Sequence, residues 1–477
     1  MRRLAITLLL VLLAAGVYAA SVDEITELVT DGHWHQADQE ITTALRQSNL
    51  DFQTKQALLF QRDRMARIRL DFNKTRDQVL RQVRAMVPGV TDEQFAAWEK
   101  SGAIENMDID GTRWYFNNAA KNLFRISSEA HEMQIKLHPD TPQEDLCRPE
   151  DAEHVIAAYD KTGQSYNSPH SFRITYTLSV HPDAVPAGET IRAWLPFPHE
   201  GNRQKNIHLI ATDPPRHVIT GHNAPLSCAY LEKPAVAGQS TDFKVVFEYT
   251  SDAYYQPLDP ARVTAVDQND PALKPFLGEA PPQIVFDDEI KKLSQEIVGS
   301  ETNPCVVARK LFEWSVTHLP WASAREYSTI PSLPHYALTC GHGDCGIKTM
   351  TFMTLCRYNG IPAHWESGWT PAIVEDMHDW CEIYLPPYGW VPVDVTYGFT
   401  SCPDERGKWF YFGGIDADRL VLNTNFCQPV YPEKMFYRSE IVDFQRGEVE
   451  WRGGNLYFNQ WSYDFHVEQI GGDKKVE

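Results

Sequence analysis

Apolar residues recur at helical spacing through the first third of the chain. In residues 25–29, 37–45 and 52–87 they fall three or four positions apart, and arginines and glutamines occupy the other face of the longest segment. This period is typical of amphipathic helices that cover a core. Thr91 is a suitable N-cap for a further helix. We therefore expect residues 21–165 to form a mainly helical N-terminal region.

Residues 109–116 interrupt this helical pattern. An Asp-Gly pair there provides a tight turn between two short segments, which predicts a β-hairpin. The alternating Asn106, Asp108 and Asp110 also resemble the start of a calcium-binding loop. The twelfth position of such a loop requires a bidentate Glu, and this chain has Asn117 there. The residues therefore favour the hairpin.

The period changes to two residues in the next part of the chain. Residues 172–180, 190–196 and 242–249 contain alternating apolar and polar side chains, and turn-forming residues lie between them. Short alternating segments separated by turns are typical of β-sandwiches. We predict a β-sandwich over residues 166–258.

Helical and strand patterns alternate over residues 259–430. We expect a capped helix at 303–318, a second helix at 345–358, and paired strands at 378–385 and 390–395. The tail, residues 431–477, is again strand-like, and we expect it to pack on this core. The whole pattern predicts an α+β fold with a helical N-terminal region, a β-sandwich and a mixed catalytic core.

The first 20 residues have the pattern of a signal peptide. Two arginines precede an apolar run that ends near Val17, and small residues follow at positions 19 and 20. The run is shorter than the ~20 apolar residues that a membrane span requires, so a membrane anchor is the less favoured alternative. No later segment is long and apolar enough to cross a bilayer. We therefore expect an exported protein, secreted or held in the periplasm or cell envelope.

Charge and cysteine content limit the classes of partner and of covalent structure. The 477 residues carry a formal net charge of −20 without a basic block, so nucleic acid is not an expected partner. Nine cysteines in an exported chain permit disulfides, and the odd number leaves at least one thiol unpaired. The number fits eight paired cysteines and one reactive thiol, and it equally fits several free, buried cysteines. The oligomeric state is left open.

Cys345 stands where a thiol is readily activated. Glycines at positions 341, 343 and 346 permit a tight turn, and the cysteine then falls in the first turn of the helix expected at 345–358. The unpaired N–H groups and partial positive charge of a helix N-terminus favour a thiolate and can hold an oxyanion. We therefore expect a lowered pKa for Cys345 and a role as nucleophile.

A nucleophilic cysteine requires a base and a group that orients the base. His378 and Asp394 lie on the two strands expected to pair, and their even separation places them on the same face, directly opposite or diagonal. Asp394 then accepts a hydrogen bond from one imidazole nitrogen while the other faces Cys345. We expect these three residues to form a catalytic triad.

These motifs resemble the bacterial transglutaminase-like superfamily. The resemblance rests on Cys345 at a helix start, Asn-Gly-Ile-Pro-Ala at 359–363, the pattern His-x-Trp-x-Glu from His378, and Gly-Trp-Val-Pro-Val-Asp ending at Asp394. It covers residues 300–400. It implies a papain-like core with Cys345 as nucleophile, His378 as general base and acid, and Asp394 as the orienting group.

Two positions depart from that family, and one family feature is ambiguous here. Asp379 stands where the family often has a small or aliphatic residue, and His364 stands where it often has Arg. An upstream Trp donates to the oxyanion in true transglutaminases, and both Trp314 and Trp321 are candidates for that role.

Other uses of the same residues compete with this interpretation. Cys340, His342 and Cys345 have compact ligand spacing, so a zinc site is one alternative, but no CxxC pair is present. We expect neither a metal nor another cofactor. For substrate binding the candidates are Trp321, Trp365 and Trp369, whereas we expect Trp380 and Trp390 in the core.

The chemistry expected from these residues is acyl transfer through sulfur. We predict an exported thiol enzyme that attacks amide or peptide bonds of a peptide or protein substrate and forms a Cys345 thioester. Hydrolysis, as in a cysteine peptidase or amidase, is favoured because an exported enzyme works in bulk water. Transfer to an amine, as in a cross-linking protein-glutamine gamma-glutamyltransferase, is an alternative, and so is a catalytically inactive binding or scaffold protein.

Overall fold

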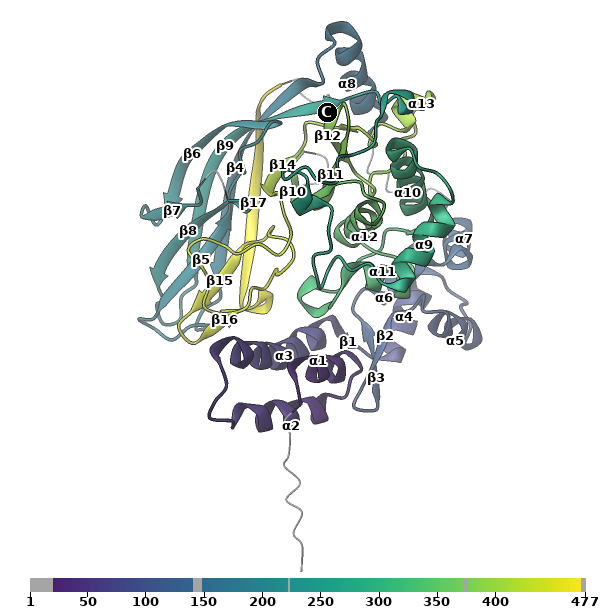
Figure 1. Ribbon diagram of the computed structural model, residues 1–477. Helices are drawn as coiled ribbons and strands as arrows, with labels where there is room; N and C mark the ends of the chain where they lie inside the picture. The colour runs from purple at the N-terminus through teal and green to yellow at the C-terminus, as the bar shows by residue number, and fades with distance from the viewer. Residues whose placement is uncertain (1–19, 140–147, 222–223, 373–375, 473–477) are drawn as a thin grey trace, which may run out of the picture. The chain divides into compact units, whose positions relative to one another are not determined.

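A computed structural model describes residues 20–139, 148–221, 224–372 and 376–472 (Figure 1). The expected signal peptide therefore lies almost entirely outside the described residues. Two compact units are present. The first comprises residues 20–66 and Met107–Arg113, and the second comprises Arg67–Asn106 and the chain from Trp114 onward.

The first unit contains α1 (Val22–Thr30), α2 (Trp34–Leu45) and most of α3 (Phe52–Asp71). The turn of the predicted hairpin belongs to it, between β2 (Asn106–Ile109) and β3 (Thr112–Phe116). The hairpin is thus confirmed. Its carboxylates have protein partners, because Asp108 pairs with Arg113 and Asp110 with His35, each at 2.7 Å.

The second unit begins with short helices around a small sheet. Its helices here are α4 (Arg76–Met86), α5 (Asp92–Lys100), α6 (Ala119–Ile126), α7 (Ser128–Leu137) and α8 (Pro149–Thr162), and β1 (Phe72–Lys74) pairs with β3. Thr91 caps α5 as predicted, because its hydroxyl accepts from the Gln94 amide.

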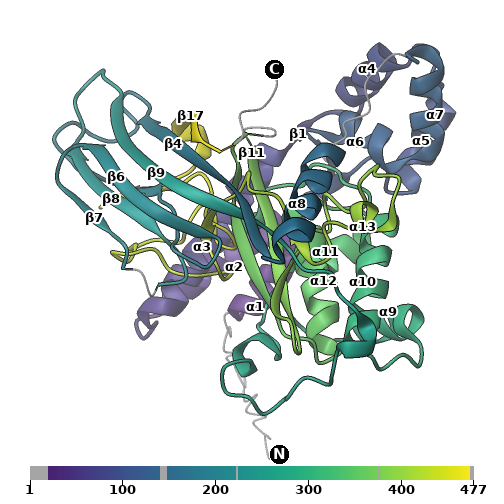
Figure 2. The same ribbon diagram turned by 90° about the horizontal axis from the view of Figure 1, so that it is seen from above.

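Two antiparallel sheets form the predicted β-sandwich (Figures 1 and 2). One contains β6 (Gln204–Asp213), β9 (Thr241–Tyr255), β4 (Tyr166–Val180), β17 (Trp461–Gly471) and the short β13 (Gly414–Ile415). The other contains β7 (His217–Ile219), β8 (Cys228–Pro234), β5 (Thr190–Pro196), β15 (Glu448–Trp451) and β16 (Gly454–Leu456). Apolar side chains from both sheets share one core.

The strands of the C-terminal tail pair with the sandwich, β17 with β4 and β15 with β5. The tail also contacts the catalytic core, because Gln445 donates to the His378 carbonyl at 3.1 Å. The sequence had predicted the strands and the contact with the core, but not the pairing with the sandwich. An alternating pattern fixes which face of a strand is buried but not which distant strand it pairs with.

The predicted mixed core is a four-stranded antiparallel sheet covered by helices. The sheet order is β12 (Gly389–Val393), β11 (Asp376–Leu385), β10 (Ala363–Thr370) and β14 (Leu420–Asn423). The helices are α9 (Asp288–Val298), α10 (Pro304–His318), α11 (Leu333–Cys340) and α12 (Cys345–Tyr358), with the short α13 (Glu405–Lys408). The bounds expected for α10 and α12 are confirmed, and so is the α+β class.

Helix α12 lies at the centre of this core (Figure 2). From Gly346 to Arg357 every residue is buried, and polar side chains in this stretch bond to the backbone, such as Thr351 to Ile347 and Arg357 to Ala363. The sheet also contacts the sandwich through Trp369, whose ring stacks on Phe465 of β17 with centroids 4.7 Å apart. Sandwich and catalytic sheet therefore share buried side chains.

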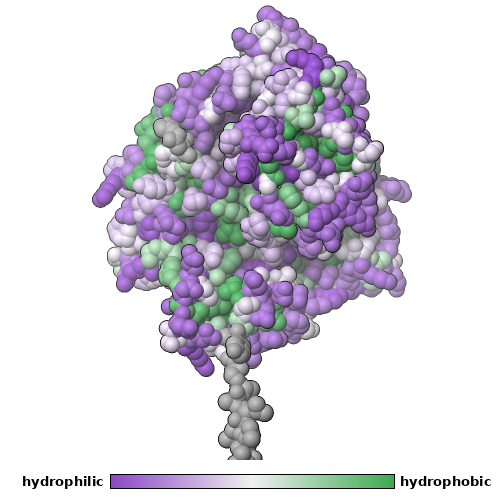
Figure 3. Space-filling model, viewed as in Figure 1, coloured by the Kyte–Doolittle hydropathy of each residue, from purple (hydrophilic) through white to green (hydrophobic). Residues whose placement is uncertain are grey.

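The surface is predominantly polar. Figure 3 shows a mainly hydrophilic face on which apolar residues form scattered patches. Among the residues that the structure describes, no helix combines the length and apolarity needed to cross a membrane.

Candidate active site

Cys345 begins α12, as the glycine-flanked motif predicted. Gly341 ends α11 in the left-handed conformation with φ 70°, and Asp344 is the N-cap of α12, its carboxylate accepting from the Ile347 amide at 3.2 Å. The Cys345 side chain is partly exposed. Cys345 therefore lies at a capped helix start and is only partly covered.

Most N–H groups at this helix start already have partners. The Tyr327 hydroxyl donates to Asp344 Oδ1 at 2.6 Å and accepts from the Gly346 amide at 3.1 Å. Together with the Ile347–Asp344 bond, this occupies two amides that we expected to stabilise an oxyanion. Among the residues that the structure describes, the Cys345 amide has no backbone acceptor, so it is the donor at this helix start that is left to bind an anionic group.

His378 and Asp394 are in direct contact. In the register Cys381 pairs with Val393, so His378 and Asp394 are diagonal neighbours on one face of the hairpin formed by β11 and β12. His378 Nε2 lies 2.7 Å from Asp394 Oδ2, and both side chains are buried. This contact assigns Nε2 to the carboxylate and leaves Nδ1 for the substrate side.

Asp394 is held as a carboxylate. Burial opposes its ionisation, but His378 and Arg419 outweigh that effect and hold the pKa of Asp394 well below its usual range. Its second oxygen accepts from the backbone amides of Thr396 and Tyr397, each at 3.0 Å. Both oxygens of Asp394 therefore take part in hydrogen bonds that fix the orientation of the carboxylate.

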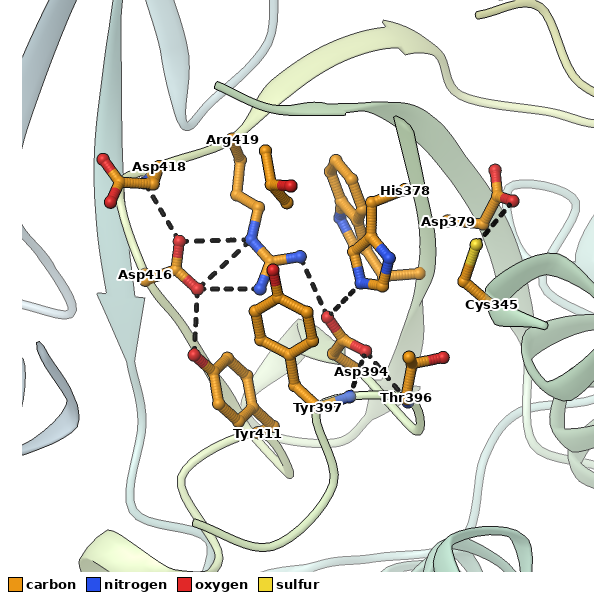
Figure 4. A network of polar contacts seen from close by, with 12 residues as sticks. Cys345, His378, Asp379, Asp394, Thr396, Tyr397, Tyr411, Asp416, Asp418 and Arg419 are labelled. Atoms are coloured by element: carbon orange, nitrogen blue, oxygen red, sulfur yellow. Dashed lines mark hydrogen bonds and ion pairs between the residues drawn. The ribbon is translucent and has the colours of Figure 1, made fainter. Parts of the chain in front are cut away.

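Arg419 and Asp416 extend this network away from the cysteine (Figure 4). The guanidinium is fully buried and donates to Asp394 Oδ2 at 2.9 Å and to Asp416 at 2.7 Å. Tyr411 also donates to Asp416, at 3.1 Å. These residues were absent from the sequence-based site. The one available signal was a charged run, Asp-Ala-Asp-Arg, in a segment otherwise rich in buried apolar residues.

Cys345 contacts the neighbour of the histidine, Asp379. Its Sγ lies 3.4 Å from Asp379 Oδ2, and among the residues that the structure describes Sγ makes no hydrogen bond to His378. Figure 4 shows the imidazole between Asp394 on one side and Cys345 on the other. The structure thus brings His378 and Asp394 into contact and places Cys345, at the start of α12, against Asp379 of β11.

The thiol of Cys345 is not acidified, which corrects our expectation. Burial raises the pKa of Cys345 well above its usual value, and the carboxylates of Asp379 and Asp344 raise it further. The helix N-terminus favours a thiolate, but two adjacent acidic groups act against it. The sequence had marked Asp379 only as a departure from the family.

The four candidate tryptophans have different environments. Trp365 and Trp369 are fully buried, so neither lines a substrate groove, and both predictions were wrong. Trp365 belongs to the core of the catalytic sheet and its helices, and Trp369 belongs to the core of the sandwich. Trp321 is half-buried, and an isolated β-bridge joins it to Gly343 in the loop before Cys345. It therefore remains a candidate substrate-binding residue. Trp314 lies over His318 at the end of α10.

The structure bears on two open alternatives, the pairing of the cysteines and the zinc site. Eight cysteines have free thiols, and Cys147 lies outside the described residues. Pairing of eight structural cysteines is therefore not found in the described chain. His342 is fully buried, and burial lowers its pKa to about 4. In the part of the chain that the structure describes, no three His, Cys, Asp or Glu side chains converge on a metal position.

Known proteins share the central part of this chain. Residues 291–395 match the transglutaminase-like superfamily. An uncharacterised protein of Haemophilus influenzae is 25% identical over 287 residues, covering 48% of this chain and 70% of the relative. Uncharacterised protein YebA of Bacillus subtilis is 31% identical over 74 residues, covering 12% of this chain and 10% of the relative.

One solved structure is similar to part of this chain. It is a protein of Cytophaga hutchinsonii provisionally described as a cysteine protease, with 14% identity and a TM-score of 0.44, covering 65% of this chain and 94% of that one.

Proposed function

This chain carries a transglutaminase-like superfamily domain, and on that premise we propose that it is a thiol enzyme that hydrolyses amide or peptide bonds through a Cys345 thioester. The observation that carries the proposal is the buried pair of His378 and Asp394, with Nε2 and Oδ2 2.7 Å apart, on the strand that contacts Cys345. A base fixed by a carboxylate beside a thiol at a helix start is the constellation that acyl transfer requires.

The proposed reaction has two stages. The Cys345 sulfur attacks the carbonyl carbon, the Cys345 amide stabilises the oxyanion, and His378 protonates the leaving amine from Nδ1. Water then attacks the thioester while His378 takes its proton. Asp394 keeps the imidazole oriented through both stages, since its contact with Nε2 at 2.7 Å leaves Nδ1 toward the substrate.

We propose further that the protein acts outside the cytoplasm on peptides or proteins. The support is the N-terminal pattern of two arginines, an apolar run and small residues. Bulk water then outcompetes amines as the acceptor, which favours hydrolysis over cross-linking.

The test uses the mature chain and a mixture of unfolded peptides with a fluorescent primary amine in excess. New peptide carboxyl ends and amine-tagged glutamines are both identified by mass spectrometry. The Cys345→Ala and His378→Ala variants serve as inactive forms, and Cys340→Ala serves as the matched control because it removes a different, partly exposed thiol.

We expect new carboxyl ends with the wild type and Cys340→Ala, and none with Cys345→Ala or His378→Ala. Amine-tagged products outnumbering new carboxyl ends would assign cross-linking transfer instead of hydrolysis. If the folded wild type yields neither product, the chain is a binding or scaffold protein.

A further inference from the structure

A carboxyl group outside the candidate triad lies against the Cys345 sulfur. Asp379 Oδ2 is 3.4 Å from Cys345 Sγ, a hydrogen-bonding distance for sulfur. The other carboxyl oxygen, Oδ1, accepts from Gln445 Nε2 at 2.8 Å. The same amide donates to the His378 carbonyl oxygen at 3.1 Å. Neither the triad nor the proposed reaction uses Asp379.

We propose that Asp379 is a further catalytic residue that shares one proton with Cys345 and takes that proton when the sulfur becomes the nucleophile. The proposal deepens the proposed function, because it names the group that deprotonates the thiol. His378 is then reserved for the leaving amine and the water.

The hydrogen bonds determine which oxygen carries the shared proton. An amide N–H can only donate, so Oδ1 of Asp379 must be an acceptor toward Gln445. A proton on this carboxyl therefore lies on Oδ2, the oxygen that faces Cys345. The same contact serves both forms, as S–H donating to a carboxylate and as O–H donating to a thiolate.

The surroundings raise the proton affinity of both groups. In water a thiol holds its proton far more tightly than a carboxyl, with ordinary pKa values of about 8.5 and about 3.9. Here burial raises the pKa of Asp379 well above its usual value, and the carboxylates of Asp443 and Asp344 raise it further. Burial and neighbouring carboxylates also raise the pKa of Cys345. Asp379 can therefore hold a proton where an ordinary aspartate is ionised, and its contact with Sγ at 3.4 Å makes Cys345 the group with which it exchanges that proton.

These neighbours come from every element packed around Asp379. The charged and titratable groups are His378 on its own strand, Asp344 and Cys345 at the start of α12, Glu326 and Tyr327 before α11, and Arg438, Glu440, Asp443 and Arg446 from the C-terminal tail. Acidic groups outnumber the basic ones, so the cluster as a whole favours a protonated Asp379.

The proton balance of the reaction is complete without another reactant. The S–H bond of Cys345 breaks, its proton goes to Asp379 Oδ2, and its electron pair forms the bond to the carbonyl carbon. The C–N bond breaks as the amine takes a proton from the imidazolium of His378. Water then gives a proton back to His378 and its oxygen to the acyl carbon. The C–S bond breaks, and the sulfur recovers its proton from Oδ2.

A proton-sharing pair has a distinctive titration. The first proton leaves the pair as a unit, and over the following pH range the thiolate fraction stays constant, because one proton is divided between sulfur and oxygen. The second proton leaves only at much higher pH. Thiol reactivity therefore rises in two steps separated by a plateau, whereas an isolated thiol shows one step.

The experiment measures alkylation of Cys345 by iodoacetamide from about pH 4 to about pH 11. Mass spectrometry of the peptide that contains Cys345 separates its rate from those of the other thiols. The variants are Asp379→Asn, Gln445→Ala and a matched control, Asp376→Asn, which removes the same charge from an exposed position on β11. Melting temperatures verify that each variant is folded.

We expect two steps for the wild type and for Asp376→Asn, and a single step for Asp379→Asn. Gln445→Ala keeps the carboxyl but removes the donor to Oδ1, which weakens the carboxylate form. We expect its plateau to rise several-fold, up to about tenfold, the scale of one hydrogen bond to a charged group. A residue that only maintains structure would lower reactivity in both variants.

Two outcomes overturn the proposal. A single step in the wild type with the same midpoint as in Asp379→Asn means that the carboxyl does not act on the thiol. A single step with a shifted midpoint means that Asp379 is a fixed charge and not a proton carrier. Alkylation needs no substrate, so a two-step profile in a chain that cleaves no peptide would refute the proposed function and leave the pair established.

Discussion

Replacing Arg419 with Met tests how far the carboxylate of the candidate triad depends on a buried cation. The guanidinium is fully buried, donates to Asp394 at 2.9 Å and binds Asp416 through Nε and Nη2. Met fills much of the same space but leaves two buried carboxylates without their cation. Breaking a buried ion pair in this way costs about 3–5 kcal/mol.

A sum over single contacts gives a larger figure. Hydrogen bonds between charged groups contribute about 1.5–3 kcal/mol each, and Arg419 makes such bonds to two partners. The substitution also removes the cost of burying the guanidinium, which offsets part of that sum. We therefore expect a loss of about 3–5 kcal/mol in the free energy of unfolding at neutral pH.

Urea unfolding followed by tryptophan fluorescence measures this loss. Adding Asp416→Asn to Arg419→Met removes one of the stranded carboxylates, so we expect the double variant to recover about half of the loss. Stabilisation by ionised Asp394 is present above its unfolded pKa and is lost as the pH falls through its depressed folded pKa. In Arg419→Met that loss begins at higher pH. A loss under about 1 kcal/mol, with no recovery in the double variant, would refute the reasoning.

Three further substitutions examine the surroundings of the site. Gly346→Ala places a Cβ 2.3 Å from the Tyr327 hydroxyl, so we expect a loss of about 1–3 kcal/mol in urea unfolding and displacement of the helix start. Burial lowers the pKa of His342 to about 4, so the wild type loses about 3 kcal/mol as the pH falls from about 6.5 to about 4. His342→Leu is expected to lack this loss, and the exposed control His335→Leu to retain it. Burial raises the pKa of Asp71 to about 8, so the stability of the wild type falls as the pH rises toward that value. The melting temperature of Asp71→Asn is expected to stay constant over the same pH range.

Local patterns predicted the part of the site that local geometry controls. The start of α12 at Cys345 was predicted from the flanking glycines, and the structure adds Asp344 as its N-cap. The contact between His378 and Asp394 follows from the even spacing of two residues across a hairpin, because side chains alternate faces along a strand. Each inference needed only a segment of about 15 residues and the geometry of one element.

The remaining parts depend on contacts between distant segments. Arg419 reaches Asp394 from 25 residues away, and Gln445 reaches Asp379 from 66 residues away. No periodicity in the sequence encodes such pairings. The pKa of Cys345 was mispredicted for the same reason, because the helix start is a local feature whereas the opposing carboxylate of Asp379 comes from another strand.

The C-terminal tail holds in place the strand β11, which carries both His378 and Asp379. On β11 His378 contacts Asp394, and the next residue, Asp379, contacts Cys345. A single amide, that of Gln445, donates both to the His378 carbonyl and to the Asp379 carboxyl, so it fixes the strand and the acid together. The Gln445 carbonyl is held in turn by the buried Trp369 indole at 3.0 Å, and the strand that follows, β15, pairs into the sandwich. The sandwich is therefore part of the framework that positions β11, and the sequence departure at Asp379 has a partner supplied from outside the family core.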